Sequence, residues 1–200
     1  MKNKGISHCL IIIFVQIISG NVIAQDFPNV VITYYSESGK TQVMAEAVAR
    51  GVAKVEYVSC TIKPIDEISM EEVINASALI LGSPVYNANI APQILEFINS
   101  WPFEGRPLKD KIGAVFVTGG GFSIGEESVM MGMIRAMLVH GMLIIGGDKT
   151  EASFGASAIT GEGDFAGKAV DTLFLKKAEG LGKRVADMVL RLNQLDDNIK

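Results

Sequence analysis

The sequence predicts an α/β protein whose parallel sheet is covered by helices on both faces. Ala78–Leu81 and Ile112–Val117 are continuous apolar runs with little alternation, as expected of strands buried on both faces. Longer segments with helical apolar spacing separate such runs, and strands that alternate with helices build a parallel sheet. A chain of 200 residues is long enough to bury such a core as one domain.

The first half of the chain supplies three strands and two helices. Val30–Tyr35 is β-branched and aromatic, which is typical of a strand. Residues 40–53 carry apolar pairs at four-residue spacing, which predicts a helix. Val55–Ile62 alternates enough for an edge strand, Glu71–Ala76 is a short helical segment, and Ala78–Leu81 is the buried strand that follows.

The second half continues the alternation. Pro92 opens a helix that runs to Asn99, because proline is tolerated in the first helical turn. Another helix extends from Glu126 to about Val139, and its first-turn acids suit the positive end of the helix dipole. The other expected segments are the strand Ile112–Val117, a last strand at Met142–Ile145, a long surface loop rich in small residues at Thr150–Gly167, and a closing helix with 3.6-residue spacing from Phe174 to Leu192.

Residues 1–24 have the pattern of a secretory signal peptide. Lys2 and Lys4 precede the apolar run Cys9–Ile18, and Val22–Ala24 offers small residues to a peptidase. The run has 10 residues, which is short for a bilayer core of about 30 Å. An uncleaved N-terminal anchor is the alternative. Residues 27–195 form the predicted folded domain, and we expect the mature protein to be exported to the periplasm.

Charge and composition argue against several function classes. The formal net charge is −4, and it becomes −6 when residues 1–24 are removed, because two lysines and no acid are lost. No run of lysine and arginine forms a nucleic-acid footprint. Two histidines and two cysteines without ligand spacing provide no metal signature. Cys60, the one cysteine left in the mature chain, is interpreted as a buried structural thiol because its surroundings are apolar.

Three loops at predicted strand ends have unusual compositions, and ligands of open α/β sheets bind beyond such ends. Ser36–Thr41 carries three hydroxyls and a glycine at a helix start, where backbone N–H groups bind phosphate; an ordinary Ser/Thr helix cap is the alternative. A triphosphate-binding loop fits poorly, because Tyr34 stands where that motif needs its first glycine. Gly82–Asn89 is aromatic and polar, and Thr118–Ser123 contains three successive glycines, against which a flat ligand can lie. Together the loops suit a planar ring that bears a phosphate.

Four stretches carry a resemblance to a known family. They are YYSESGKT (Tyr34–Thr41), GSPVYNANIAPQILEFINS (Gly82–Ser100), LVHGMLIIG (Leu138–Gly146) and FGASAITGEGD (Phe154–Asp164). Over residues 29–192 the chain resembles flavodoxin-like proteins, and specifically NAD(P)H:quinone oxidoreductases of the tryptophan-repressor-binding-protein type. The first two stretches are similar to the loops that hold the phosphate and the isoalloxazine ring of FMN, and the last two point to this subfamily.

The resemblance implies a doubly wound five-stranded parallel sheet in the order 2-1-3-4-5, which is the order of flavodoxins, with FMN at the point where the strand order reverses. It assigns the FMN phosphate to Ser36, Ser38, Gly39, Lys40 and Thr41, the flanks of the ring to Pro84, Val85, Tyr86, Asn87 and Asn89, and the pyrimidine edge to backbone N–H groups of Thr118, Gly119, Gly120 and Gly121. His140 matches a family residue near the flavin and is the one candidate catalytic residue. A histidine that caps a helix C-terminus is the alternative.

The resemblance therefore implies an FMN-dependent oxidoreductase that takes electrons from NAD(P)H, passes them to a quinone-like small molecule and forms a homo-oligomer. A non-enzymatic electron carrier outside the cytoplasm, with a redox partner protein, is the alternative, and a domain that has lost FMN is a third interpretation. Three features depart from the family. Tyr86–Ala88 replaces the family's usual Arg-Phe-Gly, and the segment before Phe154 is shorter than the insertion that helps build the family's tetrameric active site. The chain also has the pattern of a signal peptide, whereas family members are mostly cytoplasmic.

Overall fold

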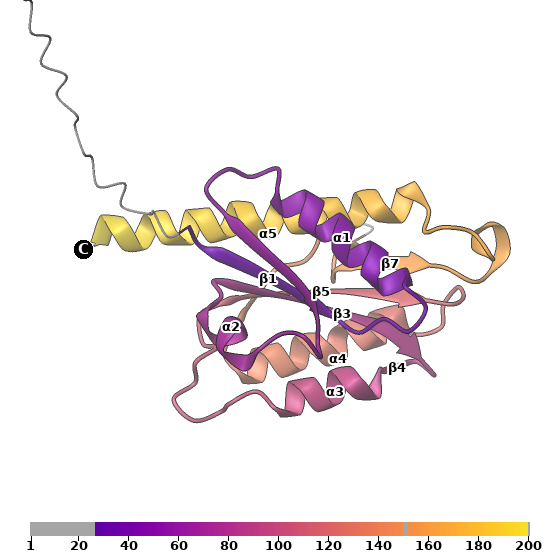
Figure 1. Cartoon of the computed structure of the whole chain (residues 1–200), viewed down its shortest axis with the longest axis horizontal. Coiled ribbons are helices and arrows are strands. Elements are labelled where there is room, and N and C mark those ends of the chain that lie inside the picture. Colours follow the sequence, from indigo (N-terminus) through magenta and orange to yellow (C-terminus); the bar gives the residue numbers. More distant parts are fainter. Residues whose placement is uncertain (1–26, 150–151, 200) are drawn as a thin grey trace, which may run out of the picture.

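The computed structural model describes residues 27–149 and 152–199, and a parallel sheet forms its centre (Figure 1). The strands are β1 (Asn29–Tyr34), β2 (Ser59–Pro64), β3 (Ala78–Tyr86), β4 (Asn89–Ile90), β5 (Ile112–Gly119), β6 (Leu143–Ile144) and β7 (Ala156–Ile159). Their order is β2-β1-β3-β5-β6, with β7 also paired to β5. β4 folds back antiparallel on β3, and the other pairings are parallel.

The fifth position of the sheet is divided between two strands. β6 pairs with the start of β5, where Leu143 lies beside Ile112, and β7 pairs with its end, where Ala156 lies beside Phe116. In the sequence, residues 145–155 separate the two pieces. The predicted order 2-1-3-4-5 is thus confirmed, but the predicted last strand at Met142–Ile145 is only the first half of the fifth strand.

The prediction of a surface loop over Thr150–Gly167 is wrong at Ala156–Ile159, which is β7. Ala156 and Ala158 are fully buried. A Cβ atom on Gly155 would lie only 2.2 Å from the backbone oxygen of Val115. The small residues of this segment therefore allow close packing against β5, which their composition alone does not distinguish from a loop.

Helices cover the sheet on both faces, as the sequence predicts (Figure 1). α1 (Lys40–Val52) and α5 (Thr172–Ile199) pack on one face, over a core that includes Ile32 and Leu181. α2 (Met70–Asn75), α3 (Pro92–Asn99) and α4 (Glu126–Val139) pack on the other, over a core that includes Leu79 and Met133. A short 3₁₀ turn, η2 (Gly163–Phe165), precedes α5. Among the described residues, no helix is long and apolar enough to cross a membrane. The predicted signal peptide lies outside them.

α1 and α5 approach each other backbone to backbone. A Cβ atom on Gly51 would lie 2.0 Å from the oxygen of Glu179, and one on Gly182 would lie 2.0 Å from the oxygen of Val48. The Glu179 side chain also pairs with Lys54 at 2.6 Å. Because larger residues would force the helices apart, these two glycines set their separation.

β2 begins later than predicted, and its Cys60 is less buried than predicted. The expected strand Val55–Ile62 starts at Ser59, because Tyr57 adopts a left-handed backbone conformation, with φ at 63°, in the preceding turn. Cys60 is exposed, so the prediction of a buried thiol is wrong. β2 is the edge strand of the sheet, and the helix layers cover it incompletely. Partial desolvation nevertheless raises the pKa of the Cys60 thiol to about 11.

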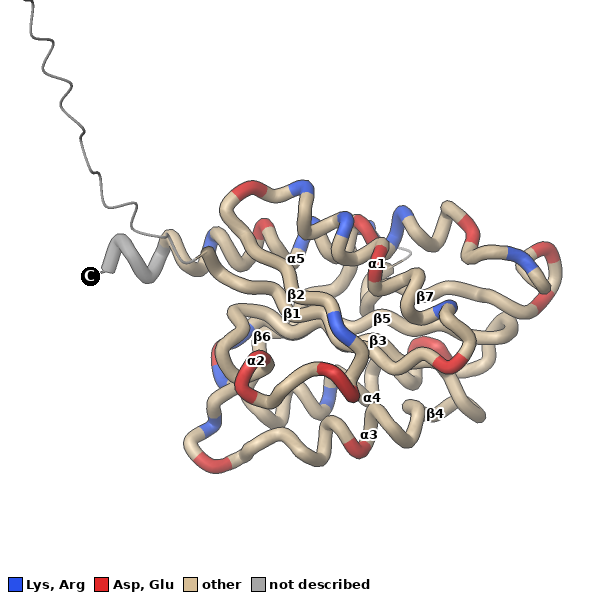
Figure 2. Tube along the Cα trace, in the orientation of Figure 1, with Lys and Arg blue, Asp and Glu red and all other residues tan. Residues whose placement is uncertain are grey.

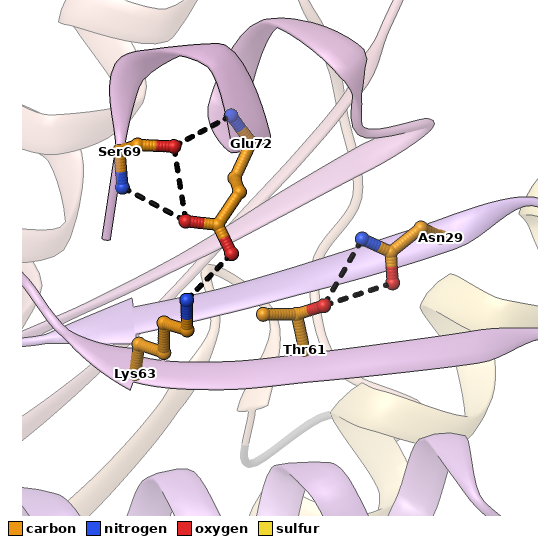
Figure 3. A network of polar contacts seen from close by, with 5 residues as sticks. All are labelled: Asn29, Thr61, Lys63, Ser69 and Glu72. Atoms are coloured by element: carbon orange, nitrogen blue, oxygen red, sulfur yellow. Dashed lines mark hydrogen bonds and ion pairs between the residues drawn. The ribbon is translucent and has the colours of Figure 1, made fainter. Parts of the chain in front are cut away.

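A small polar network attaches α2 to β2 (Figure 3). Ser69 and Glu72 form a capping box at the start of α2, in which each side chain accepts a hydrogen bond from the other residue's backbone N–H. Glu72 also pairs with Lys63 of β2 at 2.7 Å. The hydrogen bond from Lys63 and those from Ser69 lower the pKa of the Glu72 carboxyl to about 2. Beside them, the Asn29 amide donates to the Thr61 hydroxyl of β2 at 3.2 Å.

Candidate functional site

The loop between β1 and α1 ends in a left-handed glycine at a helix start. Gly39 precedes the helix in a left-handed conformation, with φ at 79°, and a Cβ atom there would meet nothing within 4 Å. The backbone N–H groups that follow lie at the helix start, where the helix dipole favours negative charge. The hydroxyl of Ser36 accepts a hydrogen bond from the backbone N–H of Gln42 at 3.2 Å. Open space at Gly39 thus leaves room for a phosphate group against the backbone.

Besides Ser36, two more of the residues predicted to bind phosphate already have partners in the protein. The Thr41 hydroxyl lies 2.8 Å from the hydroxyl of Thr118, and both side chains are buried. The Lys40 ammonium donates to the backbone oxygen of Lys168 at 2.5 Å. Thr41 therefore connects the first loop to the end of β5, and Lys40 connects it to the segment before α5.

The predicted ring-binding residues belong to a strand and a hairpin rather than to an irregular loop. Pro84 and Val85 continue β3, and Asn87 and Ala88 form the hairpin turn to β4 with φ at 51° and 60°. Left-handed conformations at both central residues match the twist of paired strands. The Asn89 amide donates to the backbone oxygen of Asn87 at 2.7 Å. The Asn89 side chain thus supports the turn from within.

Tyr86 links this hairpin to the first loop. Its hydroxyl donates to a carboxylate oxygen of Glu37 at 2.6 Å. Burial raises the pKa of the Tyr86 phenol, and the nearby Glu37 carboxylate raises it further. The phenol therefore stays protonated at neutral pH and remains a donor. Glu37 is not among the predicted site residues, because the composition of its loop indicates only a phosphate cradle.

The glycine-rich stretch begins inside the sheet. Thr118 and Gly119 are the last residues of β5, and a Cβ atom on Gly120, the next residue, would meet nothing within 4 Å. Gly121 is buried, and a Cβ atom there would lie 2.6 Å from a carboxylate oxygen of Glu162. The same carboxylate accepts a hydrogen bond from the backbone N–H of Phe122 at 2.7 Å. Bare backbone at Gly120 can therefore receive a flat ligand, while Glu162 covers the stretch beyond it.

Surface depressions flank the three loops. One of about 460 Å³ lies between the ends of β1 and β2 and the start of α3, and includes Tyr35, Ser36 and Asp66. Another of about 450 Å³ lies at the start of α4 and includes Ser123, Glu126 and Ser157. The loops between them come from β1, β3 and β5, which are neighbours in the sheet. The three loops predicted from the sequence thus lie at the carboxyl ends of neighbouring strands.

His140 lies at the other end of the sheet. It is the C-terminal cap of α4, and the residue after it, Gly141, accepts a hydrogen bond from Asp110 just before β5 begins. Its ring packs edge-on against Trp101 and Phe103, with centroids 5.4 and 5.2 Å away. Burial lowers the pKa of its imidazole, and the charge of Arg106 lowers it further. Within one chain, His140 is therefore a helix-capping residue away from the three loops, as the alternative interpretation holds.

The three loops fit FMN better than a ligand without a phosphate. Gly39 and Gly120 each present bare backbone to open space, one at a helix start and one at a strand end. The buried contact between Thr41 and Thr118 holds these two positions in one arrangement. FMN could place its phosphate against the backbone at Gly39 and its ring against the backbone at Gly120.

Comparisons with known proteins agree with this geometry. Residues 59–156 match the family of NADPH-dependent FMN reductases. The chain is 30% identical over 201 residues to an NAD(P)H dehydrogenase (quinone) of Rhizobium rhizogenes, covering 82% of this chain and 98% of that protein. It is 28% identical over 144 residues to a flavodoxin of Aquifex aeolicus, covering 67% of this chain and 75% of that protein.

The fold has a solved counterpart. The flavodoxin, WrbA-like protein of Agrobacterium tumefaciens superimposes with a TM-score of 0.67 at 23% identity, covering 82% of this chain and 98% of that one. The similarity to the Rhizobium rhizogenes protein extends over nearly the whole of that relative. The chain therefore belongs to the family of NAD(P)H dehydrogenases (quinone), and its fold is that of flavodoxins.

Proposed function

We propose that this protein is an FMN-dependent oxidoreductase that transfers electrons from NAD(P)H to a quinone-like acceptor. The observation that carries the proposal is the meeting of three loops, two of them joined by the buried 2.8 Å contact between Thr41 and Thr118. The relatives named NAD(P)H dehydrogenase (quinone) support the choice of donor and acceptor. When bound, FMN supplies the electron-accepting and electron-donating ring, and the protein supplies its position and surroundings.

The chain's own groups have three roles in this proposal. Backbone N–H groups after Gly39 and the hydroxyls of Ser36 and Ser38 hold the phosphate. Pro84, Val85 and Tyr86 flank the ring from β3. Backbone N–H groups of the Gly119–Gly121 stretch face the pyrimidine edge, where fixed donors stabilise negative charge. No side chain in this arrangement has to act as a general base.

Titration of the apoprotein with flavins tests the cofactor. We expect the mature protein to bind FMN more tightly than FAD, since the turn at Gly39 closes on a terminal phosphate. Absorbance and fluorescence changes report the binding. Equal or stronger binding of FAD would contradict the proposal, and a protein that binds neither flavin would support the third interpretation, a domain that has lost its cofactor.

An assay of turnover separates the enzyme from a carrier. A carrier remains a specific second candidate because a flavodoxin is among the relatives and the net charge is acidic. Residues of both charge signs are distributed along the chain (Figure 2). We expect NAD(P)H oxidation with benzoquinone, above the rate of free FMN, with ping-pong kinetics. Flavin-bound protein without such turnover would favour the carrier.

We propose that a second copy of the chain covers the surface around His140 in a homo-oligomer. Around His140, the side chains of Phe103, Leu138 and Val139 are more than half exposed. The indole N–H of Trp101 is buried and has no hydrogen-bond partner among the described residues. A second copy covering this surface would bury the three exposed apolar side chains. Light scattering of the wild-type protein and of Val139→Asp tests this: a wild-type monomer would contradict it.

Export remains a separate proposal, because residues 1–24 lie outside the described structure. The lysines, apolar run and small residues of that segment support it. We expect the mature protein to begin at Gln25 or Asp26. Mass spectrometry of the native protein checks this, and intact Met1 in the cytoplasmic fraction would contradict it.

A further inference from the structure

The segment from Thr160 to Lys168 lies against the glycine-rich stretch and is attached at both ends. At its start, the backbone N–H and the hydroxyl of Thr160 both donate to the backbone oxygen of Gly119, at 2.9 and 3.1 Å. At its end, the backbone oxygen of Lys168 accepts from Lys40 of the first loop. This segment therefore connects two of the three loops that form the candidate site.

Glu162 is the charged side chain of this segment that accepts a hydrogen bond from the glycine-rich stretch. One of its carboxylate oxygens accepts the backbone N–H of Phe122 at 2.7 Å. The same oxygen lies 2.6 Å from where a Cβ atom of Gly121 would be. A side chain at position 121 would thus displace Glu162, and the glycine keeps the carboxylate against the backbone. Phe165, three residues on, packs against Phe122 with ring centroids 6.1 Å apart.

We propose that Glu162 is a positioning residue that shapes the flavin site and makes its cofactor harder to reduce. Its hydrogen bond with Phe122 holds the Gly119–Phe122 stretch in the shape that presents backbone donors to the pyrimidine edge. Its negative charge beside this edge opposes the negative charge that the flavin gains on reduction. The inference rests on the proposed function, because it assumes that FMN binds at this stretch.

The two effects have different physical origins and can be separated. The hydrogen bond is local and needs only an acceptor atom, which a glutamine also provides. The charge effect is Coulombic, and because Glu162 is exposed, water and salt screen it. Removing the charge alone should therefore change the midpoint potential, and removing the acceptor as well should also change the affinity for oxidised FMN.

Three variants test the proposal. Glu162→Gln keeps the acceptor and removes the charge, while Glu162→Ala removes both. Asp164→Asn is the matched control, since Asp164 lies in the same exposed segment and has no hydrogen bond or ion pair among the described residues. Thermal unfolding first checks that each variant is folded. Flavin titration then measures the dissociation constant, and spectroelectrochemistry measures the midpoint potential at low and high salt.

We expect Glu162→Gln to bind oxidised FMN as the wild type does and to have a more positive midpoint potential. Glu162→Ala should show the same direction of potential shift and bind FMN about tenfold more weakly, the effect of losing one hydrogen bond to a charged acceptor. Asp164→Asn should change neither quantity, and high salt should reduce the shift of Glu162→Gln.

Equal potential shifts for Glu162→Gln and Asp164→Asn would overturn the inference, because they would indicate a general charge effect without contact. Unchanged FMN affinity in a folded Glu162→Ala would overturn it as well. A wild-type protein that binds no FMN is a different result, since it contradicts the proposed function itself and the inference with it.

Discussion

The two ends of the sheet are built in opposite ways. At the carboxyl edge, which consists of the loops after β1, β3 and β5, polar side chains contact one another, as in the pairs Thr41–Thr118 and Tyr86–Glu37. At the amino edge, which surrounds the C-terminus of α4, the aromatic rings of Trp101 and Phe103 pack around His140.

This difference shows which candidate residues can act together in one chain. Contacts between polar groups hold the loops of the carboxyl edge in one arrangement, so bare glycine backbone there can remain open to a ligand. The amino edge presents apolar side chains to the surface, as Val139 does with 60% of its area exposed. The carboxyl edge is therefore suited to a cofactor, and the amino edge to another protein surface.

The largest expected effect is a loss of FMN affinity, and it is tested by substituting one glycine at each edge. Gly39 and Gly105 both have positive φ, 79° and 72°, and a Cβ atom on either would meet nothing within 4 Å. Valine at either position should destabilise the fold by about 1–3 kcal/mol, because it strains the left-handed backbone. Only Gly39→Val should also weaken FMN binding, by about tenfold or more, since its side chain would occupy the space for the phosphate.

Flavin titration and chemical denaturation of the two variants measure these effects. Gly105→Val is the control for backbone strain alone. Equal losses of FMN affinity in the two variants would remove the distinction between the edges, as would a Gly39→Val variant that binds FMN like the wild type.

The next effect concerns the hydroxyl pair inside the carboxyl edge. Thr41→Val or Thr118→Val alone should lower the free energy of unfolding by about 1–3 kcal/mol, because the remaining buried hydroxyl loses its partner. The double variant should cost less than the sum of the two single variants. A double-mutant cycle by denaturant unfolding checks this. Strict additivity would mean that the 2.8 Å contact contributes no coupling.

A smaller effect is a loss of stability at alkaline pH, and it arises from Tyr86 at the carboxyl edge. Because the pKa of Tyr86 is raised above 10.0 in the folded protein, the unfolded chain loses this proton first as the pH rises. The contribution of Tyr86 to stability is therefore complete below about pH 10 and decreases above it. Denaturation of the wild type and of Tyr86→Phe between about pH 8 and 11, a range that includes the unperturbed pKa of tyrosine, measures the difference. Parallel curves for the two proteins would contradict the prediction.

The smallest effect is a loss of stability at acidic pH, and it arises from His140 at the amino edge. The pKa of His140 is lowered below 6.5 in the folded protein, so the unfolded chain binds this proton first as the pH falls. Its contribution to stability is therefore complete above pH 6.5 and is lost as the pH falls through the folded pKa. His140→Gln should flatten this part of the stability curve, and FMN affinity of the monomer should not change. If the stability of this variant fell at acidic pH as steeply as that of the wild type, the role given to His140 would be contradicted.

Features that depend on neighbouring residues in the sequence can be predicted well. The helix over Pro92–Asn99 has the predicted bounds, because proline at the first turn and the apolar spacing are local signals. The bounds of Glu126–Val139 are also as predicted, with two acids in the first turn. The three loops are identifiable because their glycines and hydroxyls follow strands directly. Their convergence follows from the parallel order of those strands.

Features that depend on distant parts of the chain require the structure. Ala156–Ile159 has the composition of a loop, and only its packing against β5 makes it a strand. Cys60 lies in an apolar stretch, yet its position in the edge strand exposes it. Motif similarity alone places His140 beside the flavin, whereas α4 carries it along the full length of the sheet to the opposite edge.

The sequence by itself determined the alternation of strands and helices and the chemistry of each loop, because both depend on spacing and residue type over a few positions. The tertiary structure decided which side chains meet. The contact between Glu162 and Phe122 joins residues 40 positions apart, and the contact between Tyr86 and Glu37 joins residues 49 positions apart. No local pattern encodes such contacts, because they arise only when packing of the two cores brings the strand ends together.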